Sequence, residues 1–432
     1  MSIFALCSIH KNFKKICTMT NTQYLEAVEW LFVQAPNYQT DGQKAYKPGL
    51  ENITKLCAFF DNPQEKIPCI HIGGTNGKGS TSNMLASVLQ EAGYKVGLYN
   101  SPHLIDFTER IKVNGKNCSK EFVYHFIQKL KTLPEDILPS FFEFTTIMAF
   151  EYFYQQKVDF AIIEVGLGGR LDSTNIIKPL VAAITNVQLD HQNILGDTLE
   201  EIAAEKAGII KPCIPVISGD ENETVKNIIR QKADQESASF IDATMIHSDL
   251  ASDLKGNYQK KNIRVVLALI EELRKINIPV SEENIVMGLL NVHQNTGFIG
   301  RWFEFSKDPL TICDTGHNQA GLEYVFSQLN SIGKHKHVIL GFVNDKKIDE
   351  VMALLPEDSE FYFAKPSINR GRHPEDYENL LQEAKISYTI FDSVQEAYLS
   401  AKERCTKEEM IFIGGSNFVV GEFLEKNLEI SE

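Results

Sequence analysis

The cysteines of this sequence lack the patterns of zinc sites and disulfide frameworks. Eight cysteines form neither a C-x-x-C pair nor a cluster with histidines at zinc-ligand spacing. We therefore expect reduced, mostly buried thiols in a cytoplasmic protein.

Long apolar runs and an excess of basic charge are also missing. No apolar run approaches the roughly 20 residues of a membrane helix, so we expect no membrane contact. The formal net charge of −14 opposes binding to nucleic acid, although a local basic pocket could still take a nucleotide. Internal repeats and low-complexity segments are absent as well. The 432 residues, of which 43% are hydrophobic, favour two or three domains with buried cores.

The first 18 residues are predicted to be a dispensable extension. Charged positions such as Lys14 and Lys15 interrupt their apolar residues, and no convincing cleavage site of a signal peptide follows. Met19 is a plausible alternative start, and Thr20 or Thr22 could cap a helix over 24–33.

A glycine-rich run predicts a phosphate-binding loop. The segment 71–80 reads His-Ile-Gly-Gly-Thr-Asn-Gly-Lys-Gly-Ser, between a strand pattern at 67–72 and a helical pattern that begins near Thr81. Glycines let backbone N–H groups close around phosphate oxygens, the helix offers its positive N-terminus, and Lys78 adds a charge. Ser80 could ligate the Mg²⁺ that accompanies ATP. The strict Walker spacing would need glycine where Ile72 stands, so a simple strand-to-helix turn is the alternative.

Short β-branched runs that alternate with helical patterns predict parallel sheets. In the first part of the chain these runs are 96–99, 160–165, 181–187 and 214–218. A helix-rich stretch at 258–290 and a polar linker at 291–300 follow. The alternation then restarts with 310–313, a helix from Ala320, 337–342, 361–364 and 410–413. The predicted fold class is α/β, with an N-terminal extension at 1–18, a mostly parallel-sheet P-loop ATPase domain at 19–296 and a smaller Rossmann-like α/β domain at 297–432.

Four further segments of the first domain end or follow strands, where ligand sites gather in parallel sheets. The segment at Ser101 is by itself as consistent with a turn as with a site. Glu164 ends an apolar strand before a glycine-rich loop, and a carboxylate there is costly to bury unless it binds a cation or a donor. His191 lies just past a strand, where a lone histidine is more often an ordinary core or surface residue.

Lys206 completes this set, because it lies among small and apolar residues near a helix end. Desolvation would lower its pKa and leave an amine that could react with CO₂, and the resulting carbamate is an oxygen ligand for Mg²⁺. An ordinary lysine that pairs with Glu200 or Glu201 is the alternative.

Together these motifs resemble the folylpolyglutamate synthase/dihydrofolate synthase family, relatives of the Mur ligases. Over residues 19–432 the family's order and spacing are met by HIGGTNGKGS, NSPHL with Glu109-Arg110-Ile111, FFEFTT at 141–146, EVGLGGRLDSTN, LDH and EKAGI. The resemblance implies a ligase of folate biosynthesis and one-carbon metabolism. Such a ligase joins a carboxylate to the amine of an amino acid at the expense of ATP, through an acyl phosphate.

The resemblance also implies the residues of the site. Catalytic roles fall on Lys78, His191, Lys206, Arg301 and His317. Contacts to ATP fall on Gly74, Thr75, Asn76, Gly77, Lys78, Gly79, Ser80, Asn262, Arg301 and Asp314. Ligands of two Mg²⁺ ions fall on Ser80, Ser101 and Glu164 for the first and on His191 and carbamylated Lys206 for the second, and Glu164 could serve both. Contacts to the pterin substrate fall on Tyr46, Lys47, Pro48, Phe141, Phe142, Glu143, Phe144, Leu171, Asp172 and Ser173.

Two features leave alternatives open. The phenylalanines of 141–144 could equally belong to the core. Trp302 follows Arg301 where the family usually has phenylalanine, which leaves the register after the arginine open.

The favoured function is a bifunctional ligase that adds L-glutamate to dihydropteroate and to reduced folates. A near alternative is a Mur-type ligase acting on a nucleotide-linked peptide precursor, but Lys78 lies too soon after Met19 for the extra N-terminal domain of such an enzyme. A regulatory P-loop module that hydrolyses ATP without ligation is the alternative from another class. The expected partners are small molecules only, and the family suggests a monomer.

Overall fold

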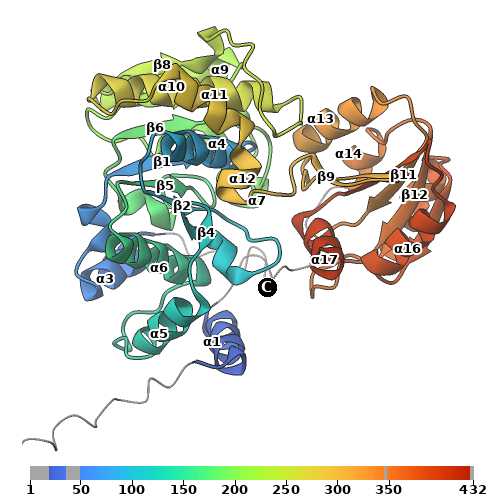
Figure 1. The fold of residues 1–432 in the computed structure, drawn as a ribbon, viewed down its shortest axis with the longest axis horizontal. Helices are drawn as coiled ribbons and strands as arrows, with labels where there is room; N and C mark the ends of the chain where they lie inside the picture. Colours follow the sequence, from blue (N-terminus) through green and yellow to red (C-terminus); the bar gives the residue numbers. More distant parts are fainter. Residues whose placement is uncertain (1–18, 36–48, 345–347, 429–432) are drawn as a thin grey trace, which may run out of the picture.

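The structure is a computed structural model that describes residues 19–35, 49–344 and 348–428. The described chain forms two α/β units, each built on its own sheet. Figure 1 shows the first unit, coloured blue to yellow, beside the second, coloured orange to red. The predicted α/β class is confirmed in both units, whereas the domain boundaries at 18 and 296 stay predictions.

The first sheet has eight strands in the order β4-β3-β2-β5-β1-β6-β7-β8. The six strands from β2 to β8 in that order run parallel, and β3 and β4 add an antiparallel edge. All five residues of β1 and of β5 are buried, as expected for central strands covered on both faces. The strands are β1 Cys69–Gly73, β2 Val96–Tyr99, β3 Ile111–Val113, β4 Lys116–Asn117, β5 Phe160–Glu164, β6 Val181–Ile184, β7 Val216–Ser218 and β8 Phe240–Asp242.

Helices cover both faces of this sheet and bury separate apolar clusters against it. One cluster unites α1, α3, α5 and α6, and another unites α4, α10 and α11. The helices are α1 Asn21–Gln34, α3 Glu51–Phe59, α4 Lys78–Glu91, α5 Lys120–Leu130, α6 Phe141–Gln156, α7 Gln192–Leu195, α8 Leu199–Ala207, α9 Glu223–Gln235, α10 Gln259–Lys275, α11 Glu282–Leu290 and α12 Val292–Thr296. Short 3₁₀ turns are η2 Pro63–Lys66, η3 Phe107–Arg110, η4 Ser173–Ile176 and η5 Ala243–Met245.

The second sheet has six strands in the order β13-β12-β11-β14-β10-β9, of which only β9 runs antiparallel to its neighbour. The strands are β9 Phe303–Lys307, β10 Leu310–Cys313, β11 Lys336–Leu340, β12 Ser359–Ala364, β13 Tyr388–Phe391 and β14 Met410–Gly414. The helices are α13 Gln319–Asn330, α14 Ile348–Met352, η6 Pro374–Tyr377, α15 Glu378–Glu383, α16 Val394–Arg404 and α17 Asn417–Asn427. They bury one apolar cluster on each face of the sheet.

The segment predicted as a polar linker contains a short helix, α12. Val292 is buried, and Asn295 donates to Ser87 Oγ at 3.0 Å and to Glu91 Oε1 at 2.8 Å, both on α4. The helix ends at Gly297, whose φ of 63° suits glycine. Packing against α4 therefore gives this polar stretch a structure that its composition does not predict.

For the described residues, the structure can be compared with the expectations about thiols and membrane helices. The six cysteines there are free thiols, and four of them are buried. None of the helices in these ranges combines the length and apolar character that a membrane span requires.

Candidate active site

A cavity of about 510 Å³ is lined by residues of both units. The carboxyl ends of β1, β5 and β6 open onto it from the first unit, and the segments after β10 and β14 line it from the second. Ligands of parallel α/β sheets bind at this edge. The predicted residues that line the cavity are Gly74, Thr75, Asn76, Gly77, Lys78, Gly79, Ser80, Ser101, Phe141, Phe142, Glu164, Leu171, Asp172, Ser173, His191, Lys206, Asn262, Arg301, Asp314 and His317.

The glycine-rich loop joins the end of β1 to the start of α4 at Lys78. Gly74 has a φ of 138°, and a Cβ there would lie 1.9 Å from Thr185 Oγ1. Gly77 has a φ of 83°, and a Cβ there would lie 2.3 Å from Asn262 Oδ1. Only glycine fits both positions, because the neighbouring side chains close directly onto the loop.

The segment after β6 holds this loop in place. Asn186 accepts from the Asn76 N–H at 3.0 Å and donates to the Asn76 carbonyl at 2.9 Å. Thr185 Oγ1 donates to the same carbonyl at 2.6 Å, and the Gln188 N–H donates to Thr75 Oγ1 at 3.0 Å. The loop is therefore organised by the protein itself before any phosphate binds. The sequence reasoning missed Asn186 and Gln188, although both lie in the Thr-Asn-Val-Gln stretch that precedes the predicted His191.

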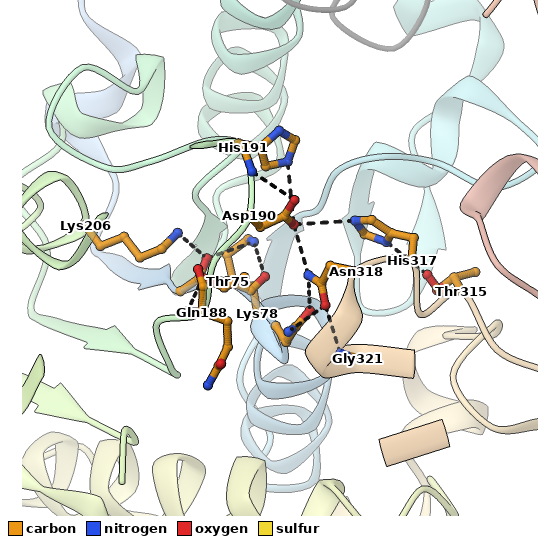
Figure 2. Close-up of polar contacts among 12 residues, drawn as sticks. Thr75, Lys78, Gln188, Asp190, His191, Lys206, Thr315, His317, Asn318 and Gly321 are labelled. Carbon is orange, nitrogen blue, oxygen red and sulfur yellow. Dashed lines mark hydrogen bonds and ion pairs between the residues drawn. The ribbon is translucent and has the colours of Figure 1, made fainter. Parts of the chain in front are cut away.

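Two lysines converge on the backbone of the loop (Figure 2). Lys78 donates to the carbonyls of Gly74 at 3.0 Å and Thr75 at 3.1 Å, and Lys206 donates to the Gly74 carbonyl at 2.9 Å. Burial, followed by the charge of Lys78, lowers the pKa of Lys206 to about 7. A substantial fraction of the Lys206 amine is therefore unprotonated at neutral pH.

Glu164, the last residue of β5, is a buried carboxylate at the cavity wall. Its Oε2 atom accepts from Asn100 Nδ2 at 2.8 Å and from the Ser101 N–H at 3.3 Å. Burial raises the pKa of the Glu164 carboxyl, while the charge of Lys78 lowers it. Among the residues that the structure describes, no lysine or arginine forms an ion pair with Glu164. A buried carboxylate in this state favours a cation in the cavity.

Asp190 connects the two units and was not among the predicted residues. Figure 2 shows it between His191 of the first unit and His317 and Asn318 of the second. Asn318 Nδ2 donates to Asp190 Oδ2 at 3.0 Å, and the Nε2 atoms of both histidines lie 3.8 Å from the same oxygen. The side-chain amides of Asn318 and Asn76 also exchange hydrogen bonds at 3.1 and 3.2 Å. The Leu-Asp-His motif contained Asp190, but its partners Asn318 and His317 lie in the other unit.

Asp314, after β10, is also shared between the units. Its Oδ2 atom accepts from the Tyr258 hydroxyl at 2.6 Å and from the Trp302 N–H at 2.8 Å, and its Oδ1 atom accepts from the Gly316 N–H at 2.8 Å. Trp302 itself is buried, with a φ of 47°. The tryptophan after Arg301 is thus accommodated in the core of the second unit, and Arg301 still reaches the cavity. Tyr258 lines the cavity as well and was missed.

Gln259, the first residue of α10, forms hydrogen bonds with both Ser80 and Asn262. Gln259 Nε2 donates to Ser80 Oγ at 3.2 Å, and Asn262 Nδ2 donates to Gln259 Oε1 at 2.7 Å. Both predicted residues line the cavity although each is almost fully buried.

Only two of the four predicted pterin contacts on α6 line the cavity. Phe141 and Phe142 line the cavity, but Glu143 and Phe144 do not. Glu143 is used for the helix cap, because its Oε2 atom accepts from the Ser140 N–H at 2.7 Å. Phe144 is buried in the core, where its ring lies 6.5 Å from that of Trp30. Neither Glu143 nor Phe144 is therefore among the residues that line the cavity, and their contact with a pterin stays a prediction.

The other predicted pterin contacts differ in where the structure places them. Asp172 lines the cavity, but its carboxylate accepts from the N–H groups of Leu167 at 2.9 Å and Thr174 at 3.0 Å, so it mainly shapes the loop. Arg110 lines the cavity beside Phe141 and was missed, although the Glu-Arg-Ile motif contained it. The predicted contacts Tyr46, Lys47 and Pro48 lie outside the described residues.

The donor set suits a divalent cation of the magnesium type. Mg²⁺ prefers oxygen ligands, and Glu164, Ser80 and Ser101 offer oxygens at one wall of the cavity. His191 and Lys206 line the same cavity. The observation that supports this fit is that the Glu164 carboxylate is buried at the cavity wall and has no ion-pair partner among the described residues.

Two family models match the chain, one in each unit. The model described as "Mur ligase middle domain" matches residues 72–286. The model described as "Mur ligase, glutamate ligase domain" matches residues 300–417. Both matches contain residues that line the cavity.

Relatives of similar sequence carry folate-related names. The dihydrofolate synthase/folylpolyglutamate synthase of Bacillus subtilis is 38% identical over 64% of this chain and 71% of that protein. The protein of that name from Escherichia coli is 30% identical over 87% of this chain and 90% of that protein. A probable bifunctional folylpolyglutamate synthase/dihydropteroate synthase of Haloferax volcanii is 30% identical over 93% of this chain. The present chain spans only about half of that longer relative, 50% of its length.

Solved structures show the same two-unit architecture. Escherichia coli FolC in complex with DHPP and ADP superposes with a TM-score of 0.79 and 29% identity, covering 93% of this chain and 97% of that one. A bifunctional folylpolyglutamate synthase/dihydrofolate synthase with Mn, AMPPNP and L-glutamate bound gives a TM-score of 0.79 and 28% identity over the same shares.

Proposed function

Since this chain belongs to the folylpolyglutamate synthase/dihydrofolate synthase family of Mur ligases, we propose that it adds L-glutamate to dihydropteroate and to reduced folates at the expense of ATP. The family consists of ATP-dependent glutamate ligases of folate metabolism. What we propose for this chain is which acceptors it uses and what each residue of the site does.

The observation that carries the proposal is the convergence of both units on one cavity. The phosphate loop, Glu164 and Lys206 come from the first unit, and Arg301 and His317 come from the second. A ligase that activates a carboxylate has to hold ATP, the acid and the amine together and keep water out. A site that is complete only when two units meet serves this purpose, because closing the units removes water from an activated acid that hydrolyses easily.

The proposed reaction has two steps. A carboxylate oxygen of the pterin substrate attacks the γ-phosphorus of ATP, and ADP leaves. The amine of glutamate then attacks the acyl carbon, loses a proton, and inorganic phosphate leaves as the amide forms. The phosphoryl transfer needs little covalent participation by the protein, so positioning and charge compensation are the main contributions of this chain.

The phosphate loop is proposed to hold the triphosphate. The residues from Gly74 to Ser80 line the cavity at the N-terminus of α4, which suits phosphate oxygens. The N–H groups of Thr75 and Asn76 already donate to Asn186, so we expect the phosphate contacts from the rest of the loop. Lys78 donates to two carbonyls of its own loop, and we expect it to exchange these contacts for phosphate oxygens. Arg301 is proposed to contact the phosphates from the second unit, Asn262 to contact the adenine, and Asp314 to contact the ribose, with His317 close by.

Two Mg²⁺ ions are proposed for the site. Ser80, Ser101 and Glu164 would hold the first, and His191 with a carbamylated Lys206 would hold the second. The metal ions supply positive charge that offsets the repulsion between phosphate and carboxylate. The pKa of Lys206, lowered to about 7, supports the carbamate because CO₂ reacts only with the unprotonated amine.

Bifunctionality is supported by the relatives and by the cavity wall. The Bacillus subtilis and Escherichia coli relatives carry both activities in their names, and the Escherichia coli structure holds DHPP. Phe141, Phe142 and Leu171 offer an apolar wall, which suits a flat pterin ring. A monomeric state and a cytoplasmic location stay predictions.

A ligation assay tests the proposal. The purified chain is incubated with ATP, Mg²⁺ and L-glutamate, with either dihydropteroate or tetrahydrofolate as acceptor, and products are identified by mass spectrometry. We expect a mass gain of one glutamyl group on both acceptors. Product from one acceptor alone would reject bifunctionality, and ATP hydrolysis that neither substrate affects would reject ligation in favour of a regulatory module.

A further inference from the structure

Two histidines and a glutamate meet at the edge of the second sheet that lies opposite the cavity. His335 directly precedes β11, and His337 is the second residue of that strand. Residues two apart on a strand share a face, and the two imidazole centroids lie 5.5 Å apart. Glu409 directly precedes β14, which pairs with β11 so that Met410 aligns with Lys336. The sheet register therefore places the carboxylate beside the histidines.

The three side chains have the geometry of a metal-binding triad. Each offers one ligand atom, and these atoms lie within 4.8 Å of one another. His337 Nε2 lies 3.3 Å from Glu409 Oε2. The His337 side chain is only 4% exposed, whereas those of Glu409 and His335 are 25% and 36% exposed, so an ion could enter from solvent.

Each imidazole of the triad has a polar neighbour at its Nδ1 atom, as is common for histidines that bind metals. The Nδ1 atom of His335 lies 2.8 Å from Asp358 Oδ1, and the Nδ1 atom of His337 lies 2.9 Å from the Tyr362 hydroxyl. Histidines that bind metals commonly give their other ring nitrogen to a carboxylate, carbonyl or other polar group, which fixes the ring and its tautomer. With the Nδ1 atoms occupied in this way, the Nε2 atoms are the candidate ligand atoms, and that of His337 already lies on the side of Glu409.

The charge around Glu409 is not neutralised by a basic side chain. Lys334 Nζ donates to the backbone carbonyls of Lys407 and Glu408, and Lys336 Nζ donates to those of Lys334 and Glu357. Among the described ranges of the chain, no lysine or arginine forms an ion pair with Glu409. The Glu409 Oε2 atom accepts from the Thr406 N–H at 2.7 Å and lies 3.3 Å from His337 Nε2. No basic side chain of the described residues therefore competes with a cation for this carboxylate.

We propose that His335, His337 and Glu409 form a site for a divalent transition-metal ion of the zinc type. Two imidazoles and one carboxylate suit Zn²⁺ or Co²⁺ rather than Mg²⁺, and a water molecule would complete a tetrahedral set. The triad is separate from the ligase cavity, because none of its members lines that cavity and it lies at the amino ends of the parallel strands. The ion would connect the starts of β11 and β14.

Metal titration of the full chain tests this site. The protein is stripped with a chelator, and Zn²⁺ is titrated against a chromophoric competitor in excess Mg²⁺, which occupies oxygen-ligand sites. Co²⁺ in place of Zn²⁺ gives a visible absorption band that reports tetrahedral ligation. The variants are His335→Ala, which alters a partly exposed side chain, and Glu409→Gln, which keeps the size of the side chain. His125→Ala is the matched control, because His125 is an exposed histidine whose Nε2 lies 3.8 Å from the Glu121 carboxylate.

We expect the parent chain and His125→Ala to bind one Zn²⁺ with equal affinity, and both triad variants to bind this ion about a hundredfold more weakly. Zn²⁺ should also raise the thermal midpoint of the parent chain and leave that of Glu409→Gln unchanged. Equal Zn²⁺ stoichiometry and affinity in all four proteins would overturn the proposal and identify the triad as a hydrogen-bonded cluster only.

Discussion

Lys206 is the residue on which the proposed metal chemistry depends most. It is buried on α8, and its one hydrogen-bond acceptor given by the structure is the Gly74 carbonyl of the phosphate loop. Among the described residues no carboxylate forms an ion pair with Lys206, and the cost of burying its ammonium group lowers the pKa to about 7. Conversion to a carbamate would remove the unfavourable cation and create an anionic oxygen ligand.

The first prediction concerns carbamylation and pH. The folded pKa of Lys206 lies near 7, below the ordinary 10.5, so the amine loses its proton as pH rises through 7. At constant dissolved CO₂, the rate at which a CO₂-stripped enzyme regains activity should rise about tenfold between pH 6 and pH 8, following the unprotonated fraction. Incubation with ¹³CO₂ should give a carbamate resonance that Lys206→Ala lacks. Full activity of Lys206→Ala, or reactivation that does not change with pH, would show that a carbamate on Lys206 is not needed for activity.

The second prediction concerns Glu164. Replacement by Gln keeps an acceptor for Asn100 Nδ2, which now lies 2.8 Å from the carboxylate, but removes the negative charge. We expect kcat to fall by at least about a hundredfold and the KM for Mg²⁺ to rise, because the charge that holds the cation is lost. The thermal midpoint should change little, since a carboxylate whose ionisation is disfavoured by burial is replaced by a neutral amide that keeps the contact to Asn100. Wild-type turnover in Glu164→Gln would show that the carboxylate does not serve the metal.

At the scale of elements, the phosphate loop depends on its packing against the segment after β6. The third prediction compares Gly74→Ala with Gly93→Ala. Both glycines have positive φ angles, 138° and 87°, but only at Gly74 would a Cβ meet another atom, 1.9 Å away at Thr185. Each substitution should cost roughly 1–3 kcal/mol of stability in backbone strain.

Only Gly74→Ala should also weaken ATP binding, by at least about tenfold, because the clash displaces the loop. Urea unfolding and calorimetric titration with ATP separate the two effects. An unchanged Kd for ATP in Gly74→Ala would mean that the loop does not hold the nucleotide.

Strand positions were well predicted where a local pattern decides them. The run 96–99 matches β2 Val96–Tyr99, and 160–165 differs from β5 Phe160–Glu164 by one residue. The run 181–187 was too long, because β6 Val181–Ile184 ends where Thr185 and Asn186 turn to the phosphate loop. A hydrophobic pattern predicts that a strand is present. It does not predict where the strand ends when the next side chains form hydrogen bonds with another loop.

The candidate site was predictable up to the point where the two units meet. Motifs placed Lys78, Glu164 and Lys206 at one cavity, because each lies at a strand or helix end with a local signature. Asp190 was missed because its partner Asn318 lies 128 residues away in the other unit. Phe142 and Phe144 could not be separated by sequence, since only packing decides which of them faces the cavity.

At the scale of the whole molecule, the contact between Asp190 and Asn318 is expected to hold the two units together. Asn318 also caps α13, accepting from the Gly321 N–H at 2.9 Å. The fourth prediction therefore uses Asn318→Asp, which keeps the cap but places a second carboxylate beside Asp190, at the 3.0 Å contact. The repulsion should lower kcat/KM by about tenfold or more.

The swapped double variant, Asp190→Asn with Asn318→Asp, restores one donor and one acceptor across the contact. Its kcat/KM should recover toward that of Asp190→Asn alone, which gives a favourable coupling in a double-mutant cycle. Additive losses in the cycle would show that the contact does not contribute to closure.

The central claim is that this chain activates a carboxylate by phosphoryl transfer and does not simply hydrolyse ATP. The most direct measurement uses dihydropteroate labelled with ¹⁸O in its carboxylate, together with ATP, Mg²⁺ and L-glutamate, and follows the isotope in inorganic phosphate. One ¹⁸O atom should appear in phosphate for each amide bond formed, because the acyl phosphate transfers that oxygen when glutamate attacks. Phosphate released without the label would contradict the claim.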